Sequence, residues 1–127
     1  MDINRLDVVE EVRRRFLQYE EAINTNDVQV LDDCFLNSPG TVRFGINETL
    51  WSFDEIKAFR RTPNTAGKTR NLERYVITTY GDTVAVANAV STRDGVPKIG
   101  RQSQTWLKQA GTWKVVSAHV SLVDALK

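Results

Sequence analysis

Two segments near the C-terminal end decide the fold: GRQSQTW at residues 100–106 and WKVVSAHVS at residues 113–121. From Val116 to Ser121 the second segment alternates apolar with polar side chains, which is typical of a strand that buries one face, and the first segment is a polar run that ends at Trp106. The turn-forming residues Gln109, Ala110 and Gly111 lie between them. The pattern therefore predicts a long antiparallel hairpin at the end of the chain.

The chain upstream of this hairpin has the same character from Arg70 onward. Residues 75–80 and 84–90 are rich in the β-branched and aromatic side chains that favour strands. Gly81-Asp82 and Asp94-Gly95 are tight-turn signals at the ends of these segments. We therefore expect a meander of about four antiparallel strands.

The N-terminal part has a helical pattern instead. Apolar side chains recur at spacings of four, three and four residues, which places them on one face of a helix: Val12, Phe16, Tyr19 and Ile23. Asn4 is the predicted N-cap of this helix, because a short polar side chain can accept from the first free backbone N–H groups.

Shorter elements follow the first helix. Asn26 is the predicted cap of a second helix through Val28, Leu31 and Phe35, and residues 41–45 predict a short strand. A third helix begins at the capping box formed by residues 52–55, in which Ser52 and Glu55 satisfy each other's backbone N–H groups. Residues 62–68 form a polar loop, which we expect to be the most mobile segment.

Helices that come first and an antiparallel sheet that follows predict a single α+β domain over residues 1–127. A strongly curved sheet, antiparallel or mixed, with the N-terminal helices packed on one face would make a cone that encloses a pocket. Such a pocket is the usual place for a small ligand.

The composition excludes several classes of function. The chain has 17 basic and 16 acidic residues, so it lacks the basic excess that nucleic acid binding requires. No apolar run approaches the length of a membrane-spanning helix, and the N-terminus has no signal-peptide pattern. A single cysteine allows no internal disulfide, so we expect a cytoplasmic protein. One histidine and one cysteine, without ligand spacing, predict no metal and no cofactor.

Four motifs in this order resemble the AtzH-like/HpxZ family: VRFG at 42–45, IKAFR at 56–60, GRQSQTW at 100–106 and AHVS at 118–121. The wider resemblance is to the nuclear-transport-factor-2-like superfamily, also called SnoaL-like or cystatin-like, whose fold is an α+β cone. That fold hosts many unrelated activities. The narrower resemblance implies a role in oxalurate or cyanuric acid catabolism. It also implies a decarboxylating amidohydrolase that acts on a carboxylated urea, and a homodimer.

By this resemblance, Tyr19 and Arg43 are the catalytic candidates. Arg43 is expected to bind a substrate carboxylate, because a guanidinium donates two parallel hydrogen bonds to a planar anion. An exposed strand arginine, or one paired with Glu48, is the alternative. Tyr19 is expected to donate a proton or a hydrogen bond, and the alternative is a core tyrosine bonded to a backbone carbonyl.

Further side chains are candidates for contact with a small carboxylate- or urea-type substrate: Trp51, Phe59, Arg60, Arg101, Gln104, His119 and Ser121. Strand alternation puts His119 on one face with Ser117 and Ser121, so this face either lines the pocket, meets solvent or forms a subunit interface. Cys34 follows two aspartates and is expected to be an inert core residue.

Three functions remain open from the sequence. One is a cofactor-free amidohydrolase with no obvious residue to activate water. The second is a non-catalytic protein that binds a small acid, or an accessory subunit in ureide or oxalurate catabolism. The third is a structural role, in which the sheet face with Ser117, His119 and Ser121 mainly mediates dimerisation.

Overall fold

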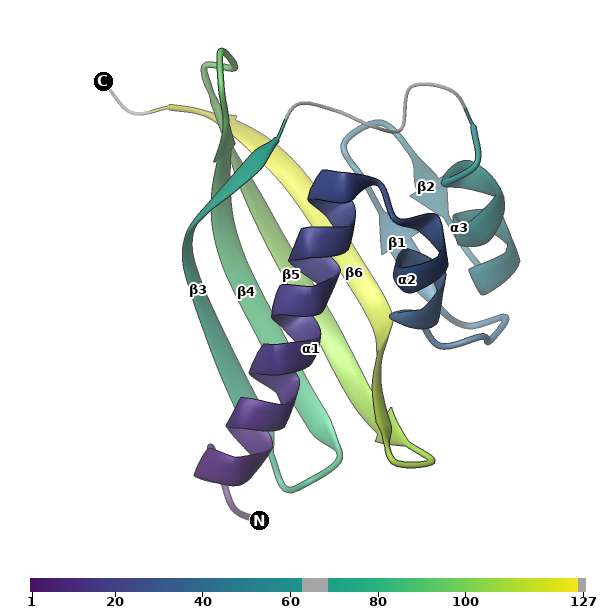
Figure 1. Cartoon of the computed structure of the whole chain (residues 1–127), viewed down its shortest axis with the longest axis vertical. Helices are drawn as coiled ribbons and strands as arrows, with labels where there is room; N and C mark the ends of the chain where they lie inside the picture. The colour runs from purple at the N-terminus through teal and green to yellow at the C-terminus, as the bar shows by residue number, and fades with distance from the viewer. Residues whose placement is uncertain (63–68, 126–127) are drawn as a thin grey trace.

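The structure is a computed structural model that describes residues 1–62 and 69–125 (Figure 1). Its helices are α1 (Leu6–Thr25), α2 (Val28–Asp33) and α3 (Phe53–Phe59). Its strands are β1 (Val42–Phe44), β2 (Thr49–Leu50), β3 (Arg70–Tyr80), β4 (Val84–Arg93), β5 (Lys98–Gln109) and β6 (Thr112–Asp124). The segment predicted to be a mobile loop lies mostly at residues 63–68, outside the described residues.

All six strands form one sheet in the order β2-β1-β6-β5-β4-β3. The four long strands pair antiparallel with their neighbours along the chain, which confirms the predicted meander. β1 adds to the other side of β6 in parallel, with Val42 opposite Ser117 and Phe44 opposite His119. The sheet is therefore mixed, as the fold class predicted.

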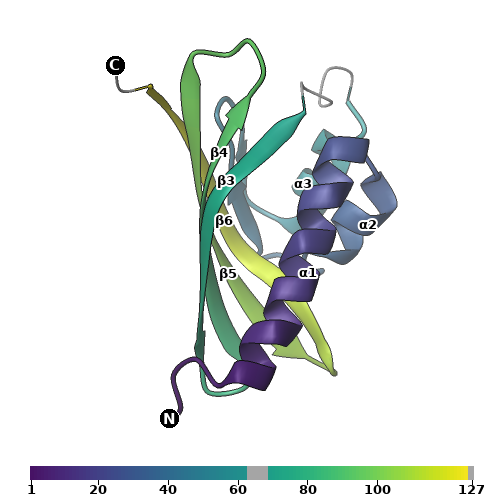
Figure 2. The ribbon, with the colours of Figure 1, turned by 60° about the vertical axis from the view of Figure 1, so that its left-hand side comes forward.

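The three helices lie on one side of this sheet, which curls around them without closing (Figure 2). Val12, Phe16 and Tyr19 of the predicted helical stripe are buried, and the Phe16 ring lies 5.1 Å from the ring of Tyr75 in β3. No helix among the described residues is long and apolar enough to cross a bilayer.

Strand β4 shows how closely the helix layer approaches the sheet. Its inward-facing residues Ala85, Ala87 and Ala89 are buried, while the larger Val84 and Val86 face away from the helices. Because alanine projects only one methyl group, the long side chains of α1 fill the space that the strand leaves.

The predicted cap of α1 was wrong. Asn4 has a left-handed backbone (φ +61°), and it bonds to the sheet rather than to the helix. Its backbone N–H donates to the carbonyl oxygen of Thr79 (3.0 Å), and its Oδ1 accepts from the N–H of the same residue (2.9 Å). The free backbone groups of the β3 edge therefore compete successfully for Asn4, and Arg5 takes the N-cap position without a side-chain bond.

The predicted cap of α2 was also wrong by one residue. Asp27 Oδ1 accepts from the Val30 N–H (3.2 Å), whereas the left-handed Asn26 (φ +52°) ends α1. The helix stops before Phe35, which instead forms a parallel bridge to Val115 of β6. At α3, Ser52 caps as predicted, but Glu55 reaches back to the N–H of Trp51.

Candidate active site

A cavity of about 180 Å³ opens at the end of the sheet where β3 begins and β4 ends. The end of α1, the end of α3 and the β1–β2 connection complete its walls. The charged side chains in its wall, among the described residues, are four arginines and one carboxylate: Arg43, Arg60, Arg70, Arg93 and Glu48. Apolar contact comes from side chains such as Phe59 and Val120.

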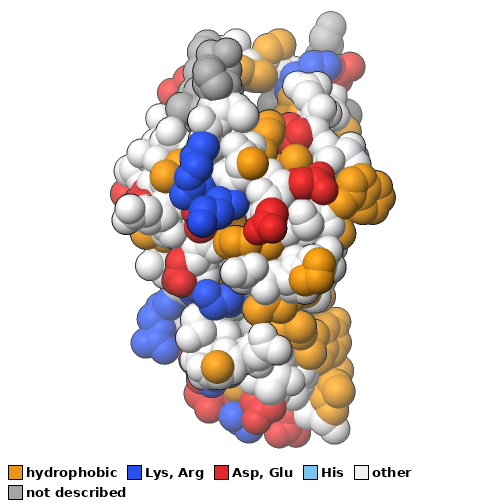
Figure 3. Space-filling model, turned by 90° about the vertical axis from the view of Figure 1, so that its right-hand side faces the viewer, with side chains coloured by type: hydrophobic (Ala, Val, Ile, Leu, Met, Phe, Trp, Pro, Cys, Tyr) orange, Lys and Arg blue, Asp and Glu red, His pale blue; other side chains and the backbone are white. Residues whose placement is uncertain are grey.

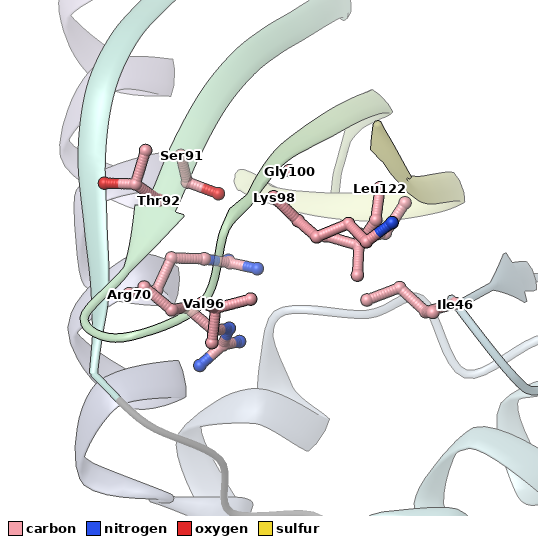
Figure 4. Close-up of a pocket in the computed structure, with 10 residues that line it drawn as sticks. Ile46, Arg70, Ser91, Thr92, Val96, Lys98, Gly100 and Leu122 are labelled. Carbon is pink, nitrogen blue, oxygen red and sulfur yellow. The ribbon is translucent and has the colours of Figure 1, made fainter. Parts of the chain in front are cut away.

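A smaller cavity of about 120 Å³ adjoins it and is lined in part by the same residues, Ile46, Arg70, Arg93 and Val120. Figure 4 shows Arg70 and Val96 on one side of this second cavity and Ile46 opposite. Ser91, Thr92 and Lys98 supply its other polar side chains. The two cavities therefore form neighbouring parts of one site, which Arg70 and Arg93 separate.

Among the described residues that line this site, the positive side chains outnumber the negative ones. Arg43 Nη1 donates to Glu48 Oε1 (2.6 Å), and Arg70 Nη2 donates to Glu20 Oε2 (2.5 Å). Burial lowers the pKa of Arg93, and the positive charge of Arg70 lowers it further. A site in which cations repel one another is one that an anion stabilises. On the side that carries α2 and α3, by contrast, both signs of charge are interspersed (Figure 3).

Two buried donors in the cavity wall have no acceptor among the described residues. They are the Nε–H groups of Arg43 and Arg70. A buried N–H without a hydrogen bond costs about 1–3 kcal/mol, so a ligand oxygen that accepts from either group would be favoured. Together with the excess of positive charge, this points to a small molecule with carboxylate or carbonyl oxygens.

Arg43 connects Glu48 to Tyr19. Burial alone would lower its pKa, but the Tyr19 phenol and the Glu48 carboxylate both interact with the guanidinium, and the net pKa is raised. Arg43 therefore keeps its charge in a largely buried position. Its pairing with Glu48 is the alternative that the sequence left open.

Tyr19 is 1% exposed and lines neither cavity, and its ring packs against Phe35 and Trp106. Burial would raise the pKa of its phenol, but the positive charges of Arg60, Arg43 and Arg70 oppose burial, and the pKa is lowered from its usual value near 10. A phenol in this setting gives up its proton more readily than a tyrosine in water.

The structure brings two of the predicted contact residues into the site and buries a third below it. Phe59 and Arg60 line the larger cavity, and the Arg60 guanidinium carbon lies 5.3 Å from the centre of the Phe35 ring. Gln104 faces the helices but is 2% exposed, and its Oε1 accepts from Trp106 Nε1 (3.0 Å). Gln104 is therefore a core residue and not a wall of the cavity.

The other predicted contacts lie outside the cavity. Arg101 pairs in register with Ser121, and Ser103 with His119, on the sheet face that points away from the helices. Trp51 is 59% exposed and packs its ring 5.1 Å from Phe44. Strand alternation turns Arg101, His119 and Ser121 away from this cavity, and Arg101 lines a separate hollow on the far face of the sheet. Contact of these residues and Trp51 with a ligand stays a prediction.

Three charged residues of the site were missed from the sequence: Glu20, Arg70 and Arg93. They come from α1, the start of β3 and the end of β4, so no sequence spacing relates them. One feature of the sequence could have identified Glu20. Glu20 follows Phe16 by four residues, on the buried side of α1, and a carboxylate there requires a partner. Its other oxygen accepts from Gln102 Nε2 (2.9 Å).

Cys34 is fully buried, which confirms its prediction as a core residue, and burial raises the pKa of its thiol. The dominant cause is burial rather than the neighbouring aspartates. Within residues 1–62 and 69–125, no three His, Cys, Asp or Glu side chains gather as a metal site would require.

Comparison with known proteins supports the same architecture. A cystatin-like fold protein from Burkholderia xenovorans is 38% identical, with 99% of each chain covered and a TM-score of 0.94. A protein of unknown function from Pectobacterium atrosepticum is 48% identical over 97% of this chain and 96% of its own, with a TM-score of 0.93. An NTF2-like superfamily protein from Salmonella enterica is 25% identical over 95% and 93%, with a TM-score of 0.71.

No curated protein of known function matches this chain. The sequence model of the AtzH-like family, however, matches residues 1–125. This match confirms the resemblance drawn from the four sequence motifs. The chain belongs to the AtzH-like family and has an NTF2-like, cystatin-like fold.

Proposed function

We propose that this protein is a cofactor-free amidohydrolase that cleaves a C–N bond in a small carboxylated urea or oxalurate-type compound. The observation that carries the proposal is the cavity lined by Arg43 and three further arginines, whose positive charges include those that lower the pKa of the nearby Tyr19 phenol. Hydrogen-bond donors that face a developing negative charge commonly contribute more to the rate of such reactions than any other group.

Arg43 and the neighbouring arginines would hold the substrate carboxylate, and Tyr19 would donate to the reacting group. Water adds to the carbonyl carbon, and the C–N bond breaks with its electron pair on nitrogen. The nitrogen takes the Tyr19 proton, and the water supplies the proton that restores the phenol. When a carbamate is released, it takes up a proton and separates into carbon dioxide and an amine.

The test is turnover of oxalurate, allophanate and carboxylated ureas by metal-free protein, with release of carbon dioxide and ammonia as the readout. Arg43→Ala and Tyr19→Phe should each abolish turnover, while His119→Ala on the far sheet face should not change it. Turnover that persists in both site variants would contradict the proposal.

A binding protein for a small acid is the second candidate, because the buried donors and the excess positive charge require only an anion. It predicts a raised melting temperature with one acid and no turnover of any. A ligand at about 100 times its Kd would add roughly 2.7 kcal/mol of stability. The cytoplasmic location and the homodimer stay predictions alongside both candidates.

A further inference from the structure

Glu48 is the only acidic side chain among the described residues that line the larger cavity. Its side chain is 19% exposed, and it lies in the connection between β1 and β2. The reaction proposed above needs a group that accepts a proton from water. No residue was assigned to that task from the sequence.

The β1–β2 connection is built to hold this carboxylate at Arg43. The Gly45 N–H donates to the carbonyl oxygen of Glu48 (2.9 Å), which closes the turn. Glu48 Oε2 accepts from the N–H of Asn47 (3.3 Å), while Oε1 accepts from Arg43 Nη1. Both oxygens are therefore positioned, and each has a further lone pair that can accept.

Gly45 is the residue that makes room for this arrangement. A Cβ atom at position 45 would lie 1.6 Å from Glu48 Oε1 and 2.9 Å from Oε2, so the carboxylate rests directly against the glycine. Any other residue at position 45 would force the carboxylate away from its place. The position of Glu48 thus depends on the absence of a side chain three residues earlier.

We propose that Glu48 is a further catalytic residue, which orients the attacking water and takes its proton. This proposal rests on the proposed amidohydrolase function. As the water oxygen bonds to the carbonyl carbon, its proton passes to the Glu48 carboxylate. The C–N bond then breaks, and the nitrogen takes the Tyr19 proton. Exchange with solvent moves one proton from Glu48 and returns one to Tyr19, so the balance closes.

Arg43 serves both ends of this arrangement. Its guanidinium donates to the Glu48 carboxylate, and its positive charge is one of those that lower the pKa of the Tyr19 phenol. The alternative is that Glu48 is only an internal competitor, which pairs with Arg43 until a substrate carboxylate displaces it.

The two roles predict opposite kinetics for Glu48→Gln, which keeps the shape of the side chain and removes its basicity. A proton acceptor predicts a fall in kcat of about 10²- to 10⁴-fold with KM changed only a few-fold. If Glu48 is only an internal competitor for Arg43, the variant should have a lower KM and an unchanged kcat, and this result would overturn the proposal.

Gly45→Ala tests the same idea without loss of charge, because it displaces the carboxylate from its place. It should lower kcat as Glu48→Gln does. Gly40→Ala is the matched control, since a Cβ atom there meets only Ser38 Oγ at 3.8 Å. Melting temperatures of all three variants separate a loss of fold from a loss of chemistry, and Glu48→Gln remains decisive if Gly45→Ala does not fold.

Failure of this proposal is distinct from failure of the proposed function. Turnover by the unmodified protein that Glu48→Gln leaves intact would refute the role of Glu48 alone. Absence of turnover by the unmodified protein on every substrate would refute the amidohydrolase function, and the role of Glu48 with it.

Discussion

Tyr19 is the residue whose chemistry the fold changes most directly. Three arginines lower the pKa of its phenol despite full burial, so it should ionise at a lower pH than the ordinary value near 10. The chain has three tyrosines, and ultraviolet titration of phenolate absorbance resolves them. We expect one early transition that disappears in Tyr19→Phe. A first transition that survives this substitution would assign the low pKa elsewhere.

The buried pair of Glu20 and Arg70 is the second residue-scale feature with a measurable consequence. Both side chains are at most 10% exposed. Glu20→Gln leaves Arg70 charged beside Arg93, and loss of one partner in a buried pair typically costs about 3–5 kcal/mol of stability. The double variant Glu20→Gln/Arg70→Met should cost less than the sum of the two single variants, which denaturant unfolding can measure.

The exposed pair of Arg5 and Asp7 is the control for that experiment. Both of its side chains are at least half exposed, so its removal should leave the unfolding midpoint unchanged. A Glu20→Gln variant as stable as this control would show that the buried pair contributes no stability.

At the scale of elements, hydrogen bonds to Glu11 connect α1 to the β5–β6 hairpin. Its Oε1 accepts from Lys108 Nζ (2.8 Å) and Trp113 Nε1 (3.0 Å). Bonds from Lys108 and Trp113 lower its pKa in the folded state. Because the pKa of Glu11 is lower in the folded state than in the unfolded state, where it is about 4.3, the carboxylate stabilises the fold above that unfolded-state pKa. This stability is lost as the pH falls through the folded-state pKa.

The contribution of the Glu11 hydrogen bonds to stability should therefore depend on pH. We expect Glu11→Gln to lower the melting temperature at pH 7 and to change it less below about pH 4. Glu21→Gln, at an exposed position of the same helix, is the control and should change neither. An equal loss of stability at both pH values would indicate that packing of Glu11, rather than its charge, matters.

The elements themselves were largely predictable, because periodicity is a local property of the chain. The stripe of α1 and the alternation of β5 appear in the structure as expected. The caps were not predictable in this way. Asn4 and Asn26 both have side chains suited to capping, but the β3 edge takes one and the left-handed end of α1 uses the other. Competition between partners in space decides such cases.

In the site, too, the residues marked by a local sequence pattern were predictable, and those brought together only by folding were not. Arg43 could be singled out because it lies in a short strand within a family motif. Arg70 and Arg93 could not, because they become neighbours only when β3 and β4 pair at their far ends. Arg101, His119 and Ser121 could not be assigned to a face, because alternation defines two faces without saying which one the helices cover.

At the scale of the whole molecule, the sheet has one face without helices. Half-buried valines of β4 point to this face, as does exposed Val76 of β3, and a soluble protein tends to cover apolar surface of this kind. The predicted homodimer would cover it. Light scattering should give twice the mass of one chain, and Val86→Glu should reduce the mass to that of one chain.

Leu17→Glu is the matched control for the dimer. Leu17 is 42% exposed on α1, on the helix side of the molecule. The variant should leave the mass of the particle unchanged. A single-chain mass for the unmodified protein would contradict the predicted dimer.

The bonds between Asn4 and Thr79 have a practical consequence for handling the protein. β3 is a long outer strand, and its exposed backbone groups are a template for aggregation with other chains. Ile3 and Asn4 cover the last residues of that strand, and the chain irregularity between Leu72 and Arg74 interrupts the rest. An affinity tag that replaces the first four residues would uncover this edge and favour insoluble fibrils, so purification tags belong at the C-terminus.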